Sequence, residues 1–286
     1  MNGLLVIDKA AGMTSHDVVA MCRRILGERR VGHAGTLDPS ATGVLVLGVG
    51  RATRLLRFVE DSDKEYVVTA AFGITTSTLD AEGEVVAEND TSSLTEEDVR
   101  SALTAFVGDI EQVPPMVSAV KVGGEPLYRK ARRGEDVERA PRRVRVHELD
   151  LDLDSFEPGP RARATLRVRC ARGTYVRSLV ADVGDALAVG ASVAILRRTR
   201  VGSFTETDAI LISEVTPQAL RPMETAVAGY PRRSVDEAGA RALVHGKPLA
   251  PGGIDGVYAV YGPDGLLAMA EDREGEARSL CVLTQG

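Results

Sequence analysis

The sequence contains no tryptophan and few aromatic side chains of any kind, at 4% of its 286 residues. Its three cysteines, Cys22, Cys170 and Cys281, are odd in number and far apart in the chain. This spacing excludes a CxxC metal or redox motif and fits a reducing compartment. The four histidines are equally scattered. The sequence therefore predicts no metal site.

Long apolar runs are also missing. No stretch of eighteen or more apolar residues occurs, so we expect no helix that spans a membrane. The short apolar run at 4–7 is interrupted by Asp8 and Lys9, which makes it too short for a secretory signal. We therefore expect a cytoplasmic protein without membrane contact. A chain of 286 residues fits one large domain, alone or with a small companion.

Charge is unevenly distributed along the chain. A net charge of −6 argues mildly against a nucleic-acid ligand, because phosphate binding usually needs an excess of Lys and Arg. However, residues 161–177 contain six arginines and no acid, and residues 129–145 contain eight bases against three acids. These two segments suggest a basic face on an otherwise acidic protein, although charge runs are more often merely solvated.

Hydrophobic periodicity predicts interspersed helices and strands. We expect helices from Thr14 or Ser15 to Gly27, from Thr95 to Gly108, and from about 176 to Gly190. Alternation of apolar and polar residues predicts strands at 64–74 and 161–170, the second with one apolar and one arginine face. After about residue 230 the composition changes to a hairpin with a Gly-Pro-Asp-Gly turn and a further strand.

The most informative stretch is GHAGTLDPSATGVLVLG at 32–48. It places Asp38, the only acid between Glu28 and Glu60, in a glycine-rich loop that leads into an apolar strand. The flanking cations are Arg29, Arg30, Arg51, Arg54 and Arg57. An anion ringed by cations keeps its charge, so we expect a carboxylate that acts as a nucleophile or base. A lone Asp-Pro in a loop is more often a simple turn residue.

Three separate motifs resemble the TruB family of tRNA pseudouridine synthases. The Asp38 loop matches the family's catalytic motif at every residue from Val31 to Leu45. The opening GLLVIDKAAGMTSHDVV resembles the first family motif, which usually has Lys-Pro where this chain has Lys9-Ala10. RGTYVRSL at 172–179 resembles the third. The resemblance implies an α+β fold, with a mixed, largely antiparallel sheet around a cleft and a small β-rich tail similar to PUA-like or TruB C-terminal domains.

The resemblance also implies a reaction, the isomerisation of a uridine in the T-loop of tRNA, at position 55, to pseudouridine after base flipping. Asp38 would be the catalytic group, Arg177 would pair with it, and neither cofactor nor metal would be needed. The substrate contacts that the family implies are His33, Tyr66, Tyr175, Leu196, Asp80 and Lys9. The sequence does not decide whether Asp38 attacks C1′ or C6 or deprotonates C2′.

A segment rich in Pro, Gly and Arg follows residue 112, and a polar excursion of this length fits a binding loop. The resemblance makes residues 120–146 a basic flap that grips the T-arm of tRNA. Candidate phosphate contacts are Lys121, Arg129, Lys130, Arg132 and Arg133. We expect a catalytic domain at 1–225, a C-terminal domain at 230–286, and no required protein partner.

Other functions compete with this one. A phosphate-binding enzyme lacks its motif here, since neither GxxxxGK[ST] nor GxGxxG occurs. A glycosidase needs a second carboxylate beside Asp38, and only Asp80 qualifies. A tRNA-binding or folding protein without catalysis, in which Asp38 is a turn residue, stays open, as does a pseudouridine synthase acting on another RNA.

Overall fold

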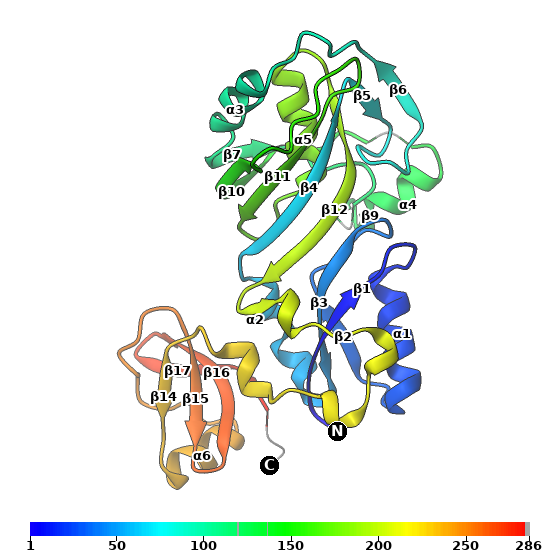
Figure 1. The fold of residues 1–286 in the computed structure, drawn as a ribbon. Coiled ribbons are helices and arrows are strands. Elements are labelled where there is room, and N and C mark those ends of the chain that lie inside the picture. The colour runs from blue at the N-terminus through cyan, green and yellow to red at the C-terminus, as the bar shows by residue number, and fades with distance from the viewer. Residues whose placement is uncertain (119, 136, 284–286) are drawn as a thin grey trace.

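The computed structural model of the protein describes residues 1–118, 120–135 and 137–283, with the backbone alone at a few positions between 121 and 132. Its main element is a nine-stranded sheet (Figure 1). The strands are β1 (Gly3–Lys9), β2 (Val31–Ala34), β3 (Thr42–Val49), β4 (Lys64–Phe72), β7 (Gly108–Gln112), β10 (Arg142–Leu151), β11 (Arg163–Cys170), β12 (Ala191–Val201) and β13 (Phe204–Thr205).

The strand order is β1-β3-β12-β4-β11-β10-β7, with β2 added to β3 and β13 added to β12. Every pair is antiparallel except β3 with β12, which is parallel. The expected α+β fold with a mixed, largely antiparallel sheet is therefore confirmed. This parallel pair joins the start of β3, which follows the Asp38 loop, to the part of β12 that carries Leu196. It therefore places Asp38 and Leu196 on neighbouring strands.

The described residues form six helices, and the last of them packs on the C-terminal sheet. They are α1 (Ser15–Leu26), α2 (Leu56–Glu60), α3 (Glu96–Thr104), α4 (Leu127–Arg132), α5 (Val176–Ala186) and α6 (Glu237–Val244). Short 3-10 turns are η1 (Gly50–Leu55), η2 (Glu206–Asp208), η3 (Ile212–Glu214), η4 (Pro217–Ala219) and η5 (Met223–Val227). No helix among the described residues combines the length and the apolar character that crossing a bilayer requires.

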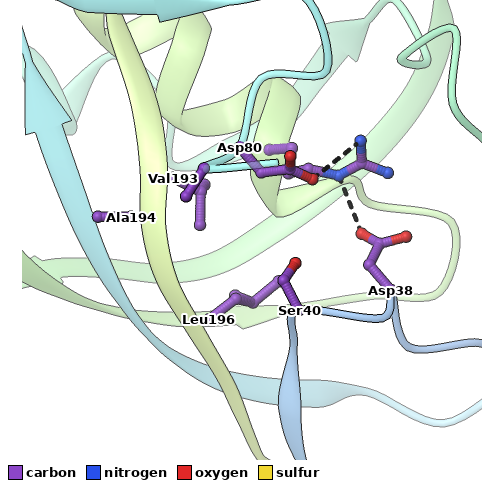
Figure 2. A pocket seen from close by; sticks show the side chains of 8 residues that line it. Asp38, Ser40, Asp80, Val193, Ala194 and Leu196 are labelled. Atoms are coloured by element: carbon purple, nitrogen blue, oxygen red, sulfur yellow. Dashed lines mark ion pairs between the residues drawn. The ribbon is translucent and has the colours of Figure 1, made fainter. Parts of the chain in front are cut away.

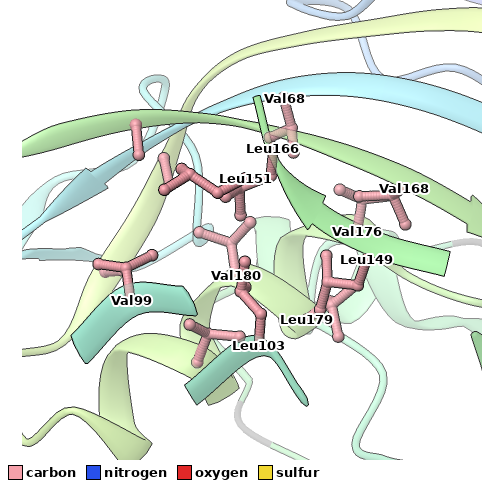
Figure 3. Close-up of a cluster of buried hydrophobic side chains, with 14 of the residues drawn as sticks. Val68, Val99, Leu103, Leu149, Leu151, Leu166, Val168, Val176, Leu179 and Val180 are labelled. Carbon is pink, nitrogen blue, oxygen red and sulfur yellow. The ribbon is translucent and has the colours of Figure 1, made fainter. Parts of the chain in front are cut away.

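The largest core lies between the sheet and helices α3 and α5 (Figure 3). Val99 and Leu103 of α3, Leu179 of α5 and Leu166 of β11 are all buried in it. This burial follows from the sequence, because apolar residues at helical spacing meet the apolar face of alternating strands. The core fixes α5 against the sheet and thereby fixes the residues at its N-terminal end.

Smaller sheets complete the chain. Two hairpins are β5 (Ile74–Thr76) with β6 (Val85–Glu88), and β8 (Lys121–Val122) with β9 (Glu125–Pro126). The C-terminal sheet has the order β14 (Arg232–Ser234), β15 (Val257–Gly262), β16 (Gly265–Arg273) and β17 (Glu276–Val282). Leu266 and Met269 of this sheet share a buried cluster with Leu55 and Phe58. The C-terminal unit is thus packed on the η1 and α2 region of the main body.

The predicted helix starts are confirmed, but two predicted ends are wrong. Thr14 and Thr95 each cap their helix in a capping box with the Asp three residues later. α3 ends at Thr104 rather than Gly108, because the N–H of Ala105 bonds back to Ala102 and Leu103 and tightens the last turn. α5 ends at Ala186, since Ala188 adopts a left-handed backbone with φ of 56° ahead of Gly190.

The basic face suggested at 161–177 does not form. Each arginine on the surface of this segment except Arg163 is in an ion pair with an acid from a neighbouring segment. The pairs are Arg161 with Glu88, Arg167 with Asp152, Arg169 with Glu148 and Arg172 with Asp61. The sequence could not show this, because the acids lie on strands and turns distant in the chain. The segment is largely neutralised by its neighbours.

Gly43, at the start of β3, tests how tightly this region is packed. Its φ is 101°, and a Cβ there would lie 2.1 Å from the carbonyl oxygen of Arg198. We expect Gly43→Ala to lower the free energy of unfolding by about 3 kcal/mol, from backbone strain plus the clash. Gly12→Ala is the control, since Gly12 has a φ of 83° but nothing within 4 Å. Urea denaturation measures both, and equal losses would contradict the predicted clash.

Candidate active site

The loop that carries Asp38 is anchored on both sides of that residue. Ser15, buried at the start of α1, accepts a hydrogen bond from the N–H of Leu37 at 2.9 Å and donates one to its carbonyl at 3.2 Å. The carbonyl of Pro39 accepts from the ammonium of Lys9 at 3.1 Å and from the N–H of Gly12 at 2.9 Å. The first segment of the chain therefore holds the backbone of Asp38 in one position.

Lys9 is fully buried, with 0% of its surface exposed. Besides Pro39, its ammonium donates to the carbonyls of Ala10 at 3.0 Å and Met13 at 2.8 Å. All three donors of the ammonium are therefore in use. Burial lowers the pKa of Lys9 to about 8. We expected Lys9 among the substrate contacts, but its position in the structure is that of a support for the Asp38 loop.

Arg177, in the first turn of α5, links two carboxylates. Its Nε lies 2.9 Å from Oδ2 of Asp38, and its Nη1 lies 3.5 Å from Oδ2 of Asp80. Both ion pairs are drawn as dashed lines in Figure 2. The remaining donors go to the carbonyls of Thr78 and Val117, each at 2.7 Å. A guanidinium that is only 4% exposed thus has its directions fixed by four partners.

The electrostatics of Asp38 differ from what the flanking arginines suggested. Burial raises the pKa of Asp38 above its ordinary value, and the positive charge of Arg177 opposes that rise. The flanking cations lie elsewhere: Arg51 and Arg54 donate to the carbonyls of Leu283 and Val282 at the end of the chain. The expected ring of cations is wrong, because β2 separates Arg29 and Arg30 from the loop and β3 separates Arg51, Arg54 and Arg57 from it.

Asp80 is buried and held in place by its own turn. Its Oδ1 accepts hydrogen bonds from the hydroxyl of Thr78 at 2.5 Å and from the N–H of Glu82 at 3.1 Å. The preceding Leu79 has a φ of 62°, which is a strained conformation for a leucine and typical of functional turns. We expected Asp80 among the substrate contacts; in the structure it holds Arg177 from the side opposite to Asp38.

A bulge in β12 shapes the floor of the site. The register of β12 against β4 shifts between Val193 and Ile195, so Ala194 is the extra residue. Val193, Ala194 and Leu196 consequently all line the hollow beside Asp38 and Asp80, whereas Ile195 is 61% exposed (Figure 2). Leu196, which we expected among the substrate contacts, is thus one of the residues beside Asp38.

The aromatic candidates lie close to this hollow without lining it. Tyr66 is on β4. Burial raises the pKa of its phenol, and the negative charge of Asp38 adds to that rise. Tyr175 caps α5, and both its N–H and its carbonyl bond to the amide of Gln112. Burial also raises the pKa of Tyr175. Both phenols therefore remain protonated at neutral pH.

His33 lies on β2, with its ring edge-to-face against His16 at 5.3 Å between centroids. Burial lowers the pKa of His33 to about 4, so the ring is neutral at pH 7. Its Nδ1 is buried and has no hydrogen-bond partner among the described residues. A neutral, weakly basic ring fits the predicted binding role better than a role as general base.

The sequence did not single out Arg198, which is 1% exposed and lies beside the Asp38 loop. It donates to the carbonyls of Val44 at 2.8 Å and Gly35 at 3.1 Å, and so ties β12 to the Asp38 loop. The sequence did contain a pattern that indicates this position. Arg198 is two residues after Leu196, and residues two apart on a strand lie on the same face. Lys64 was also missed; burial lowers its pKa to about 8, and Arg198 adds to that effect.

Of the flap residues that we expected to contact phosphate, the structure describes the side chains of Arg129, Lys130 and Arg133. Arg129 is exposed and Lys130 half-buried on α4. Arg133 is in ion pairs with Glu125 and Glu135, both at 2.7 Å. The side chains of Lys121 and Arg132 lie outside the part that the structure describes. No group of three or more metal-ligating side chains occurs among the described residues.

Comparison with known proteins decides the family. The model described as TruB family pseudouridylate synthase, N terminal domain, matches residues 23–176. The chain belongs to the TruB family. Two further models match the rest: tRNA pseudouridylate synthase B C-terminal domain at 177–228, and tRNA Pseudouridine synthase II, C terminal, at 230–284. The protein is therefore a pseudouridine synthase, an isomerase, and the three TruB motifs in its sequence correspond to the segments that meet at Asp38.

Relatives support this over nearly the whole chain. The tRNA pseudouridine synthase B of Mycobacterium sp. (strain KMS) is 46% identical over 289 residues, which cover 98% of this chain and 96% of the relative. That of Thermobifida fusca is 46% identical over 288 residues, covering 98% of each. Among solved structures, a chain of the Cbf5-Nop10-Gar1 complex matches with a TM-score of 0.77 and 28% identity, over 99% of this chain and 85% of that one.

The position of Arg177 between two acids predicts a large effect on stability. Removing one member of a buried ion pair leaves an uncompensated charge, so we expect Arg177→Met to lower the free energy of unfolding by roughly 3–5 kcal/mol. Arg167→Met is the control, because that arginine pairs with Asp152 but is 63% exposed, and exposed pairs contribute little. Similar losses for both variants in urea denaturation would refute the structural importance of Arg177.

Proposed function

We propose that the protein isomerises the uridine at position 55, in the T-loop of tRNA, to pseudouridine, and that it does so in the cytoplasm. The observation that carries the proposal is Asp38, ion-paired at 2.9 Å to a buried arginine and with 31% of its side chain exposed beside a small hollow. The names of the relatives, tRNA pseudouridine synthase B, support tRNA as the substrate.

The reaction is an internal rearrangement of one nucleotide. The N1–C1′ bond breaks and a C5–C1′ bond forms, while C5 loses a proton and N1 gains one. The atoms and electrons balance without an oxidant or a second substrate. The protein must supply a carboxylate that acts at C1′, at C6 or at the C2′ proton, and a pocket that retains the uracil while it turns.

The side chains around Asp38 fit these tasks. Arg177 fixes the direction of the carboxylate and stabilises its charged form. Leu196 supplies an apolar surface beside it, and the rings of Tyr66 and Tyr175 are the flat surfaces available for the uracil. Because their phenols stay protonated, both tyrosines can donate a hydrogen bond to a carbonyl oxygen of the base.

The hollow beside Asp38 is small in the free protein. Its volume is about 20 Å³, which is room for about one water molecule. Extrusion of the base from the RNA costs a few kcal/mol, and stacking on an aromatic side chain returns roughly 1–3 kcal/mol. We therefore expect the side chains around the hollow to rearrange when the base enters.

Asp80 is unsuited to the role of general acid that a glycosidase would need. A general acid must reach the leaving group, whereas Oδ1 of Asp80 accepts hydrogen bonds from Thr78 and Glu82 and Oδ2 faces the guanidinium of Arg177. Both oxygens of Asp80 are therefore directed at protein partners. The pair of carboxylates therefore supports one reacting group and one orienting group.

Release of tritium from tRNA labelled at uridine C5 tests the proposal directly. We expect release by the wild type, with Asp38→Asn retaining less than about a thousandth of the rate because the amide is a poor nucleophile and base. A transcript with cytidine at the target position should release nothing. Asp38→Asn should still bind tRNA.

Four results would contradict parts of the proposal. Binding of tRNA by the wild type without tritium release would favour a tRNA-binding or folding protein. Release from the cytidine transcript would place the target uridine elsewhere in the tRNA, and release only from another RNA would change the substrate. Full activity of Asp38→Asn would remove Asp38 from the chemistry.

The raised pKa of Asp38 predicts a pH dependence. A protonated Asp38 cannot act as nucleophile or base, so kcat/KM should fall as the pH drops through that raised pKa. Arg177→Lys has a single ammonium that cannot bridge both acids, so the carboxylate loses stabilisation and the acid limb should move to higher pH. The pH profile of kcat/KM for tRNA measures this, with Arg167→Lys as the control. An unchanged limb, or one at lower pH, contradicts the predicted pairing.

A further inference from the structure

Helix α5 carries residues of the site but has no cap of its own. Tyr175 is its N-cap residue, and the tyrosine side chain makes no capping hydrogen bond. Most helix starts are held by a Ser, Thr, Asp or Asn at this position, as Thr14 and Thr95 hold α1 and α3. The start of α5 must therefore be fixed from another part of the chain.

Gln112, the last residue of β7, supplies this attachment. Its side-chain oxygen accepts a hydrogen bond from the N–H of Tyr175 at 3.1 Å, and its side-chain nitrogen donates to the carbonyl of Tyr175 at 3.3 Å. A backbone N–H only donates and a carbonyl only accepts, which fixes the orientation of the amide. Two bonds to one residue fix both its position and its rotation, as pairing with a neighbouring strand would.

Burial makes both of these bonds necessary. Gln112 is only 2% exposed, and a buried amide costs free energy unless its polar atoms are bonded. The carbonyl of Tyr175 also accepts the first helical bond of α5, from the N–H of Leu179 at 3.0 Å. The Tyr175 backbone is thus held by the helix on one side and by Gln112 on the other.

The chain that follows β7 contacts the start of α5 at two further points. We call residues 112–117, which lead into the flap, the flap root. The carbonyl of Val113 accepts from the hydroxyl of Ser178 at 2.8 Å, and that of Val117 accepts from Nη2 of Arg177 at 2.7 Å. The flap root therefore determines where the first turn of α5 lies.

The ring of Tyr175 lies at the end of a long side chain that begins at this attachment. Burial raises the pKa of its phenol, and the negative charge of Asp38 adds to that rise, so the phenol and the carboxylate are close to each other. A small rotation of the Tyr175 backbone displaces the ring by a larger distance. The placement of the ring beside Asp38 consequently depends on how firmly the backbone is held.

We propose that Gln112 is a positioning residue, which holds the ring of Tyr175 where the uracil must lie for the rearrangement. The inference rests on the proposed function, in which Tyr175 is one of the flat surfaces for the base. Gln112 touches no reacting atom and acts through the backbone of Tyr175. A displacement of about 1 Å caused by a change remote from the chemistry can lower a rate by about 10²-fold, so such a residue can control the chemical step.

The test is Gln112→Met, which keeps the length of the side chain and removes both hydrogen bonds. We expect the single-turnover rate of tritium release from labelled tRNA to fall by about 10- to 100-fold. The Kd for tRNA should stay within about twofold of the wild-type value, because contacts to the RNA backbone supply most of the affinity. An unchanged rate would overturn the proposal.

The control is Thr91→Val, which removes a similar pair of buried bonds from segments without site residues. Thr91 is 0% exposed, and its hydroxyl donates to the carbonyl of Gly159 and accepts from the N–H of Ala162, each at 2.7 Å. We expect both variants to lower the Tm and only Gln112→Met to slow tritium release. Equal falls in rate in the two variants would show a general loss of structure and overturn the proposal.

A double-mutant cycle with Tyr175→Ala tests whether Gln112 acts through the ring. The rate of the double variant should lie within about twofold of Tyr175→Ala alone, because the ring that Gln112 holds is already absent. A merely structural role would instead multiply the two losses. That result would overturn the proposal.

Fluorine NMR of protein labelled with fluorotyrosine reports on the ring without requiring activity. The chain has six tyrosines, and the signal missing from Tyr175→Phe is that of Tyr175. We expect Gln112→Met to shift or broaden this signal and Thr91→Val to leave it in place; an unmoved signal in Gln112→Met contradicts the proposal. If the signal moves but the wild type releases no tritium, Gln112 still positions Tyr175, and it is the proposed reaction that fails.

Discussion

The site depends on one buried guanidinium between two carboxylates. Arg177 is 4% exposed and has ion-pair or hydrogen-bond partners on Asp38, Asp80, Thr78 and Val117. A charge this deeply buried is tolerated only when its partners satisfy it. The same contacts that make Arg177 acceptable to the fold therefore hold the Asp38 carboxylate ready beside the hollow.

Support for Asp38 comes from segments far apart in the sequence. Lys9 and Ser15 hold the backbone on either side of it, and Arg198 ties its loop to β12 through the carbonyls of Gly35 and Val44. Three buried cations, Lys9, Lys64 and Arg198, are accommodated through backbone carbonyls rather than acids. The backbone carbonyls and the buried side chains around Asp38 are thus held in fixed positions. This suits a reaction that depends on the orientation of the reacting groups and needs no further chemical group.

Charge matching also extends to the surface. The segments richest in arginine in the sequence, 129–145 and 161–177, are partly neutralised by acids from other segments of the chain. The electrostatic character of these surfaces is therefore set by the fold and not by local composition.

Local sequence patterns were sufficient to predict the family, the class of fold, the helix starts and the central residue of the site. These patterns are the capping boxes at Thr14 and Thr95, the alternation in β4 and β11, and an unbroken motif around Asp38. The pair of Arg177 with Asp38 was already implied by the family resemblance. The remaining contacts could be learned from the folded chain alone: the five flanking arginines lie away from Asp38, Lys9 supports its loop, and Arg198 ties that loop to β12. Pairing between distant segments depends on sheet order and on the parallel contact of β3 with β12, which no local pattern in the chain encodes.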